Sequence, residues 1–370
     1  MRVLHVLNSI ERSGMELMLI TSANEWKRHG YSCDVVAIAS GEGPAAPAMR
    51  AAGYRLFHIP FRSRYRFLPR AGFLRDFYRL CRSRYDVVHI HVETATALFA
   101  LLALAAGSRK IAVTPHSTFR FNGNVWFRKR MERWIIRHLG GRYGMISDSV
   151  RKCEMEEFGN TGVRVQNWID TEHFRPPSQA ERAEARRDAG LQPTETVVVS
   201  IGNCEEVKNH GSLLRALAQI PETQRPAYIH VGREDKDASE RALASALGIA
   251  DRVRFTGSLA DVRPVLWAAD LYVMPSLREG FGMSAVEAIA CGVPVVFAKV
   301  DGLVDIAAST KWAVLTETTP ESIGKGIMAV LSLPADERQV RARDDSRRVR
   351  QQFSVENGVA SIVENLYASR

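Results

Sequence analysis

Residues 276–296 of the chain read Ser-Leu-Arg-Glu-Gly-Phe-Gly-Met-Ser-Ala-Val-Glu-Ala-Ile-Ala-Cys-Gly-Val-Pro-Val-Val. The apolar run before them, residues 270–275, predicts a buried strand, and the run 293–297 predicts another. Between the two runs, a helix is predicted to begin after Gly282 and to stop at Gly292. A strand, a glycine-bearing loop and a helix in this order predict one unit of a parallel α/β sheet.

The loop and the helix start in this segment are suited to bind an anion. Backbone N–H groups and the positive end of the helix dipole meet where the loop enters the helix. Glu279 lies in the loop, and Glu287 lies about two turns into the helix. A phosphate site with a carboxylate on each side suits a ligand that carries both phosphates and hydroxyl groups. That description fits a nucleotide sugar.

Strand-like runs alternate with helical patterns along the whole chain of 370 residues. This alternation predicts parallel, doubly wound sheets, and so many strands indicate two Rossmann-like domains facing a cleft. The first domain is expected at residues 1–168 and the second at 169–350, because two prolines break the pattern within 170–178. The predicted strands are 3–7, 33–39, 55–59, 86–91, 111–114, 144–146, 163–165, 196–201, 227–231, 253–255, 271–274 and 293–297.

The composition is typical of an enzyme from a reducing compartment. Hydrophobic residues make up 46% of the chain, which is enough to bury a large core. The five cysteines are scattered and odd in number, which argues against a disulfide framework or a structural zinc site. Residues 1–8 are interpreted as a first core strand rather than a signal peptide. The longest apolar segment, 95–106, is shorter than the about 20 residues that span a bilayer. We therefore expect a cytoplasmic protein.

The formal net charge of +9 is concentrated in two stretches that also contain aromatic residues. Such stretches suit an interfacial helix on an anionic membrane, so peripheral contact with the inner face of the cytoplasmic membrane is one interpretation. The other is a solvated helix whose aromatics face the core. Nucleic acid is not expected as a partner, because no known nucleic-acid-binding signature is present. The basic residues are Arg62, Arg64, Arg66, Arg70, Arg75, Arg79, Arg82 and Arg84 in the first stretch, and Arg120, Arg128, Lys129, Arg130, Arg133, Arg137 and Arg142 in the second.

The order and spacing of several short motifs resemble those of the family 4 retaining glycosyltransferases, which have the two-Rossmann GT-B fold. The resemblance covers nearly the whole chain. It implies that residues 351–370 form a C-terminal helix that packs back on the first domain. The motifs that carry it are Ser13-Gly-Met-Glu16, Asp86-Val-Val-His-Ile-His91, Thr114-Pro-His-Ser117, Asn167-Trp-Ile-Asp170, Gly202 to His210, Asp251 to Gly257, and the segment with Glu279 and Glu287.

The resemblance also implies a role for each candidate site residue. It implies that Glu279 and His116 are catalytic and lie beside the donor sugar. Lys208 would bind the donor pyrophosphate, and Glu287 would accept hydrogen bonds from the ribose hydroxyls. The remaining implied positions are Gly202, Asn203, Gly280, Phe281, Gly282, Met283 and Gly14 for donor binding, and Ser13, Glu16 and His91 on the acceptor side.

The chain departs from the family pattern at three positions. Ser13 and Trp168 replace glycines, and Asn203 replaces an arginine that would be a second cation for the pyrophosphate. Either another cation, Arg278 or Arg233, substitutes, or the enzyme has little activity. The alternative to an active transferase is therefore a weakly active GT-B-like protein that binds nucleotide sugar or serves as a partner subunit. A sugar-nucleotide epimerase or phosphorylase is a further class on this fold, but neither a pyridoxal-binding lysine nor a hydrolysing base is recognisable.

No cofactor and no metal are expected, and a nucleotide-diphosphate sugar is the expected donor substrate. His89 and His91 share one face of a predicted strand, but a third metal ligand is not evident. Residues 235–237 read Asp-Lys-Asp, a pattern that holds metal elsewhere, yet GT-B enzymes generally do without a metal. The expected function is metal-independent, retaining transfer of a sugar to a glycan or lipid-linked acceptor, in bacterial-type surface polysaccharide or glycolipid synthesis.

Overall fold

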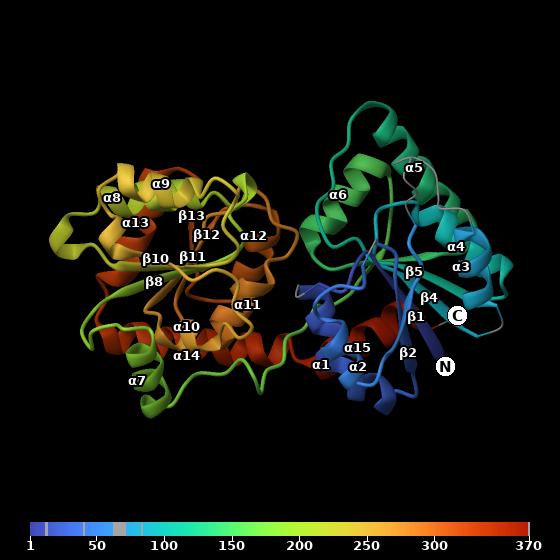
Figure 1. The fold of residues 1–370 in the computed structure, drawn as a ribbon, viewed down its shortest axis with the longest axis horizontal. Helices are drawn as coiled ribbons and strands as arrows, with labels where there is room; N and C mark the ends of the chain where they lie inside the picture. The colour runs from blue at the N-terminus through green and yellow to red at the C-terminus, as the bar shows by residue number, and fades with distance from the viewer. Residues whose placement is uncertain (12–13, 40, 62–71, 83, 369–370) are drawn as a thin grey trace. The chain divides into compact units, whose positions relative to one another are not determined.

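The computed structural model describes residues 1–11, 14–39, 41–61, 72–82 and 84–368. The chain divides into two compact units (Figure 1). Unit 1 contains Met1–Asp170 and Phe353–Arg370, and unit 2 contains Thr171–Gln352. Each unit is built on one parallel sheet that is flanked by helices. The predicted α/β fold with two Rossmann-like sheets is therefore confirmed.

The sheet of unit 1 has seven parallel strands in the order β3-β2-β1-β4-β5-β6-β7. Its central strands are buried on both faces, which is why they are continuous apolar runs rather than alternating ones. Two of these runs are interrupted by histidines, and the parallel register places His5 of β1 opposite His89 of β4. The strands are β1 (Arg2–Leu7), β2 (Ser32–Ala37), β3 (Arg55–His58), β4 (Val87–Ile90), β5 (Lys110–Val113), β6 (Arg142–Met145) and β7 (Val163–Arg164).

The helices of unit 1 bury one face each. In α3, Phe73, Phe77 and Leu80 recur at helical spacing and are buried, whereas Arg75 and Arg79 are exposed. For this helix the aromatics therefore face the core, and residues 62–71 of the same basic stretch lie outside the described residues. The helices are α1 (Gly14–Arg28), α2 (Ala46–Ala51), α3 (Phe73–Cys81), α4 (Thr96–Ala105), α5 (Gly123–His138), α6 (Asp148–Phe158) and α15 (Val355–Ile362), which continues into the π-helix Val363–Tyr367.

The C-terminal segment completes unit 1, as the predicted return of the last helix requires. The backbone N–H of Ile169 donates to the carbonyl of Phe353 at 2.9 Å. Gly358 packs so closely on Trp168 that an added Cβ would lie 2.3 Å from a ring carbon. The Trp168 indole N–H in turn donates to the carbonyl of Met18 at 2.8 Å. The tryptophan that replaces the family's glycine is thus a buried packing residue of unit 1.

The sheet of unit 2 has six parallel strands in the order β10-β9-β8-β11-β12-β13. Strand β13 was not predicted; it has three residues and pairs with the neighbouring β12. The core of this unit contains a cluster that includes Val198, Leu213, Val273 and Ile327. The strands are β8 (Val197–Ile201), β9 (Ala227–Val231), β10 (Val253–Phe255), β11 (Leu271–Met274), β12 (Val295–Ala298) and β13 (Val314–Thr316).

The helices of unit 2 include a long, highly charged one, α14. It also has a buried side, where the Asp345 carboxylate accepts two backbone N–H bonds and the Ser346 hydroxyl donates to Ala290. The α-helices are α7 (Gln179–Asp188), α8 (His210–Gln219), α9 (Ser239–Ala246), α10 (Arg263–Ala268), α11 (Met283–Ala290), α12 (Asp301–Ala307), α13 (Pro320–Leu331) and α14 (Ala335–Gln352). The short 3-10 helices are η1 (Glu206–Lys208), η2 (Glu222–Gln224) and η3 (Ala250–Arg252).

Membrane-spanning helices were not expected from the sequence. Within the described residues, every helix is too short or too polar to cross a bilayer. The most apolar predicted segment, 95–106, contains the ten-residue helix α4 of unit 1.

Candidate functional site

The loops at the carboxyl ends of β8 and β11 in unit 2 contain most of the predicted donor-binding residues. In open parallel sheets, ligands bind at this edge. The two loops are joined directly, because the backbone N–H of Leu277 donates to the carbonyl of Val207 at 2.8 Å. Asn209 adds side-chain bonds to the carbonyls of Pro275 and Thr318, at 3.0 and 3.1 Å. The loops are therefore held together by backbone and amide contacts.

Two glycines allow these loops to approach their neighbours closely. A Cβ at Gly232 would lie 2.0 Å from the carbonyl oxygen of Gly202, so the loop after β8 lies against the end of β9. A Cβ at Gly302 would lie 2.6 Å from the carbonyl of Gly280. The backbone N–H of Gly302 donates to the backbone carbonyl of Glu279 at 3.0 Å. Larger residues at either position would displace a predicted donor-binding loop.

Helix α11 begins where the sequence predicted, with Gly282 at its N-cap in the left-handed region at φ 90°. Met283 is the first helical residue, so the positive end of the helix dipole lies at residues 280–283. Phe281 is buried beneath this turn. The predicted strand–loop–helix arrangement of an anion site is present.

Lys208 and Glu279 form an ion pair across the two loops. The Lys208 ammonium donates to a carboxylate oxygen of Glu279 at 2.7 Å, and the side chains are 24% and 15% exposed. The structure thus brings together the residue predicted to bind pyrophosphate and the one predicted to face the sugar. A partly exposed cation at the carboxyl end of β8 can exchange its carboxylate partner for a phosphate.

Glu287 is buried on α11, as the surrounding apolar residues predicted. It is 9% exposed, and burial raises the pKa of its carboxyl group to about 7. A carboxyl group in such surroundings needs hydrogen-bond donors in order to ionise. Ligand hydroxyl groups would supply them.

Asn203 has a structural contact at the position where the family has arginine. Its side-chain oxygen accepts a hydrogen bond from the backbone N–H of Arg233 at 3.1 Å. The side chains of Arg233 and Arg278, the two cations named as substitutes, are both exposed. The carboxylate of Asp235, from the Asp-Lys-Asp pattern, accepts a 2.9 Å bond from the backbone N–H of Ser239 at the start of α9.

Unit 1 brings two predicted residues, His91 and His116, into direct contact. Nδ1 of His91 lies 2.9 Å from Nε2 of His116. A residue that was not predicted, His5, joins them, with its Nδ1 3.0 Å from Nε2 of His91. The sequence signal for His5 was its position inside the first predicted strand. Strands 1 and 4 are neighbours in a doubly wound sheet, so a histidine in the first strand lies close to the histidines of the fourth.

The histidines of this cluster are neutral at pH 7. Burial lowers the pKa of His5 to about 3 and that of His116 to about 4. Burial and the neighbouring imidazoles lower the pKa values of His89 and His91 well below their usual range. Ring nitrogens of His5, His89 and His91 lie within 4.8 Å of one another, which supplies the third candidate metal ligand that the sequence did not reveal.

The geometry of that trio is unfavourable for a metal. Both nitrogens of His89 already have partners: Nδ1 lies 2.6 Å from the Tyr367 hydroxyl and Nε2 lies 2.7 Å from the Thr114 hydroxyl. The rings of His89 and His91 have centroids 3.9 Å apart and planes tilted by 37°, whereas metal ligands point their nitrogens at a common centre. The cluster is arranged as a hydrogen-bonded group of rings.

Gly14, predicted for donor binding, and Glu16, predicted on the acceptor side, lie at the start of α1. Gly14 is its first residue, and Glu16 is buried in its first turn. Ser13 lies outside the described residues. The structure therefore gives Gly14 and Glu16 a place at the helix start.

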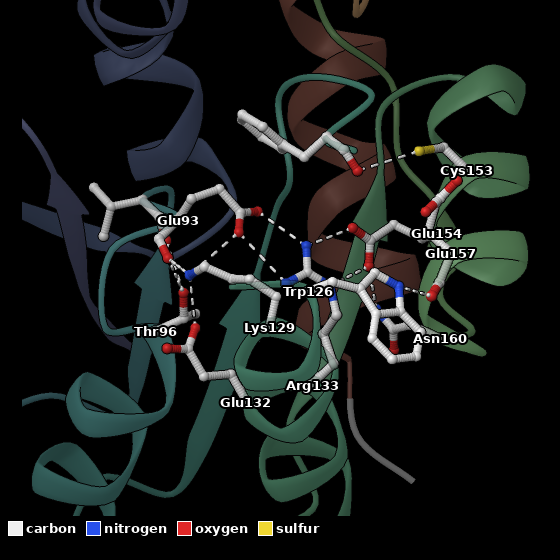
Figure 2. A network of polar contacts seen from close by, with 12 residues as sticks. Glu93, Thr96, Trp126, Lys129, Glu132, Arg133, Cys153, Glu154, Glu157 and Asn160 are labelled. Carbon is white, nitrogen blue, oxygen red and sulfur yellow. Dashed lines mark hydrogen bonds and ion pairs between the residues drawn. The ribbon is translucent and has the colours of Figure 1, made fainter. Parts of the chain in front are cut away.

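The prediction that Lys129 and Arg133 contact a membrane is wrong. Both are buried on α5, and Figure 2 shows that they point into a network of acids. Arg133 binds Glu154 with two hydrogen bonds, at 2.8 and 2.6 Å, and Glu93 at 3.1 Å. Lys129 donates to Glu132 at 2.8 Å and to the Glu93 carbonyl. Burying these cations requires such partners, and Glu93 and Glu154 come from other segments, which a local charge count misses.

Comparison with known proteins identifies the family. A family model described as "Glycosyltransferase Family 4" matches residues 12–173, and one described as "Glycosyl transferases group 1" matches residues 181–348. A D-inositol 3-phosphate glycosyltransferase of Mycobacterium sp. (strain KMS) is 42% identical over 231 residues, which are 60% of this chain and 49% of that protein. The chain thus spans about half the length of the curated relatives it matches.

Solved structures confirm the GT-B fold. The crystal structure of Anabaena HepE in complex with UDP and glucose has a TM-score of 0.86 at 20% identity and covers 100% of both chains. A glycosyltransferase from Rickettsia africae has a TM-score of 0.82 at 16% identity and covers 98% of this chain and 97% of its own. With both halves matched by models of one group of enzymes, the chain belongs to the family 4 glycosyltransferases.

Proposed function

We propose that the protein transfers a sugar from a nucleotide-diphosphate sugar to a glycan or lipid-linked acceptor, with retention of configuration and without a metal. The arrangement in unit 2 is the observation that carries the proposal. Lys208, Glu279, Glu287 and the start of α11 lie on loops and a helix at one edge of the sheet. They supply a cation, two carboxylates and a helix dipole, as a diphosphate with sugar and ribose hydroxyls requires.

Charge stabilisation is the main contribution that these residues would make to the reaction. When the bond between the anomeric carbon and the phosphate oxygen breaks, negative charge grows on the departing diphosphate. Lys208 and the positive end of the α11 dipole favour that charge. Glu279 would oppose the positive charge that develops on the sugar ring, and Glu287 would hold the ribose. His116, in unit 1, would contact a sugar hydroxyl.

The proposal is tested with a panel of UDP-, GDP- and ADP-sugars. We expect one donor to be consumed in the presence of an acceptor extract, with the anomeric configuration retained in the product by NMR and with activity that survives a chelator. An inverted product or chelator-sensitive activity would contradict the mechanism. Binding of a nucleoside diphosphate without any turnover would favour the alternative of a weakly active protein or partner subunit. Asn203 and Ser13, which depart from the family pattern, are the residues that still support that alternative.

A role in the synthesis of surface polysaccharide or glycolipid would place the protein at the inner face of the cytoplasmic membrane. The exposed side chains of α5 support contact with that membrane. Phe127, Met131 and Trp134 recur at i, i+4 and i+7, and they are 62%, 38% and 54% exposed. The exposed Arg128 and Arg130 lie beside this apolar stripe. An outward apolar stripe with arginines beside it suits an anionic bilayer surface.

Vesicle co-sedimentation tests this contact. We expect binding to vesicles that contain phosphatidylglycerol, weaker binding at high salt, and a loss of binding when Phe127, Met131 and Trp134 are changed to Ser together. Val340→Ser is the matched control, because Val340 is 69% exposed on α14 of unit 2. Equal binding to neutral vesicles, or an unaffected triple variant, would refute the membrane contact.

A further inference from the structure

Three imidazoles in unit 1 form a continuous chain from a buried end to a partly exposed end. Nδ1 of His5 lies 3.0 Å from Nε2 of His91, and Nδ1 of His91 lies 2.9 Å from Nε2 of His116. The ring centroids are 5.3 and 5.2 Å apart, and neighbouring planes differ by only 26° and 34°. In each pair, the ring centroids are farther apart than the two nitrogens by about one ring diameter. The nitrogens therefore lie on the line between the two rings and point at each other, as N–H···N hydrogen bonds require.

The number of protons in this row of three imidazoles is fixed. A neutral imidazole has one N–H group and one bare nitrogen. Burial keeps His5, His91 and His116 neutral at pH 7 by lowering their pKa values. Three rings therefore share three protons, and each of the two N···N contacts must contain one of them.

This condition allows two joint states. If His91 has its proton on Nδ1, it donates to Nε2 of His116, which then has its own proton on Nδ1. Nε2 of the same His91 accepts from Nδ1 of His5, so all three rings are Nδ1–H tautomers. If His91 has its proton on Nε2, the same reasoning makes all three rings Nε2–H tautomers. Mixed states leave one contact with two protons or with none.

We propose that His5 and His91 are positioning residues that form a tautomeric relay with His116. In one state Nδ1 of His116 is a donor, and in the other it is an acceptor. A ligand hydroxyl group whose proton is held by another contact meets this nitrogen only as an acceptor or only as a donor, so it selects one state, and the choice passes through His91 to His5. The inference rests on the proposed function, in which His116 contacts a sugar hydroxyl.

The buried end of the chain leaves both states available. Nε2 of His5 is buried and has no hydrogen-bond partner among the described residues. It is an unpaired acceptor in one state and an unpaired donor in the other, so neither state gains a hydrogen bond at this end. A ligand that forms one hydrogen bond with His116 in only one of the two states can therefore shift the balance between them.

His89 holds the relay in place without belonging to it. The centroid of its ring lies 3.9 Å from that of His91, and the two ring planes are tilted by 37°. The hydroxyl groups of Tyr367 and Thr114 bond its two nitrogens, and because hydroxyl protons rotate, these contacts suit either tautomer of His89. The plane of His91 is thus fixed, whereas its proton is free to be on either nitrogen.

The test is ¹⁵N NMR of the full chain labelled at its ten histidines, assigned by single substitutions. We expect the same Nδ1–H to Nε2–H ratio at His5, His91 and His116, and we expect UDP-glucose to shift the three ratios together. UDP, which lacks the hydroxyl groups of the donor glucose, should shift them less. Different tautomers at any two of the three rings would overturn the relay.

Substitution of the buried end provides the second test. His5→Asn keeps an amide group that can contact His91 but removes the second ring nitrogen. We expect at least a twofold change in the tautomer ratio of His116, two hydrogen bonds away, and a fall in the turnover of the sugar donor with unchanged UDP affinity. His58→Asn is the control, because His58 of β3 bonds the Ala39 carbonyl outside the cluster. An unchanged His116 ratio in His5→Asn overturns the proposal.

A metal assay and a turnover assay complete the test. Equimolar zinc in the purified protein, lost in His5→Asn, would show that His5, His89 and His91 form a metal site and would overturn the relay. Matching tautomers in a protein that turns over no sugar nucleotide would refute the proposed function and leave the relay standing. A protein that turns over a sugar nucleotide but has unmatched tautomers would support the proposed function and overturn the relay.

Discussion

The ammonium group of Lys208 lies 2.7 Å from the carboxylate of Glu279, so the two loops at the edge of the unit 2 sheet are joined by an ion pair. One partner is the cation proposed for the diphosphate, and the other is an anion that would repel it. Donor binding must therefore redistribute the contacts of Lys208 between a carboxylate and a phosphate. Substitution of either partner should reveal this competition.

Lys208→Ala should weaken the binding of UDP or GDP by about tenfold to a hundredfold. A charge-assisted hydrogen bond of this kind contributes about 1.5–3 kcal/mol, and here it would be lost from the diphosphate. Calorimetric titration of the variant measures the effect. Lys311→Ala is the control, because Lys311 pairs with Asp344 on the surface of the same unit. An unchanged affinity for both diphosphates would remove Lys208 from the donor site.

Glu279→Gln should bind UDP as tightly as the native protein or more tightly, and it should transfer sugar more slowly. The substitution removes a negative charge beside the phosphate site and releases Lys208, but it also removes the carboxylate proposed to face the sugar. An interaction that forms only in the transition state changes turnover and not ground-state binding. Calorimetry and initial rates on one preparation separate the two effects. Native turnover in this variant would exclude Glu279 from the mechanism.

Glu287 should make both stability and nucleotide binding depend on pH. Its folded pKa of about 7 lies above the ordinary value of 4.5, so the folded state binds the proton more tightly. Stability is then lost as pH rises from about 4.5 to 7, by about 3 kcal/mol for this group. Thermal unfolding between pH 5 and 8 should show a steeper decline in the native protein than in Glu287→Gln.

Ribose hydroxyls favour the ionised carboxylate, so UDP binding near pH 7 should release a proton from Glu287. Calorimetry in buffers of different ionisation enthalpy measures this release. Because UDP itself also titrates, the informative quantity is the difference between the native protein and Glu287→Gln. Equal proton release in the two proteins would argue against contact between Glu287 and the ribose.

Asn203→Arg should strengthen diphosphate binding by several-fold to tenfold. The substitution places a second cation where the family has one, at the cost of a single hydrogen bond to the Arg233 backbone. Fluorescence or calorimetric titration with UDP measures the gain. If Arg233 or Arg278 already supplies the second cation, changing that residue to Ala should weaken binding in the native protein but not in Asn203→Arg.

Arg133→Met should destabilise unit 1 by about 3–5 kcal/mol, because Glu154 would remain buried without its cation. Arg128→Gln, at an exposed position on the same helix, should change stability by less than about 0.5 kcal/mol. Hydrogen exchange of α5 and α6 measures the local effect. Equal protection in the two variants would mean that the network in Figure 2 contributes little to stability.

The sequence predicted the strands and the start of α11 well, because both depend on local patterns. Apolar runs bounded by glycine and proline located twelve strands, and the three-residue β13, whose Leu315 is exposed, was missed. The start of α11 followed from the glycine that precedes an apolar helical pattern, whereas the ion pair between Lys208 and Glu279 became visible only in the structure.

Contacts between distant segments could not be predicted in the same way. Lys129 and Arg133 belong to a basic, aromatic-rich stretch, and their burial depends on acids such as Glu93 and Glu154 from other elements. The place of His5 beside His91 depends on strand order, which is known only once the sheet is assembled. Local charge and periodicity contain no information on such pairings.

The return of residues 353–370 to unit 1 has a consequence for folding during synthesis. Lys110 bonds the carbonyl of Tyr367 at 2.7 Å, and the Tyr367 hydroxyl bonds His89, so the sheet of unit 1, although synthesised before unit 2, is completed by residues synthesised after unit 2. Unit 2 has all of its residues on the nascent chain while unit 1 still lacks part of its interior. Domains generally fold in the order in which they emerge from the ribosome. In this chain the second domain can reach its native state before the first.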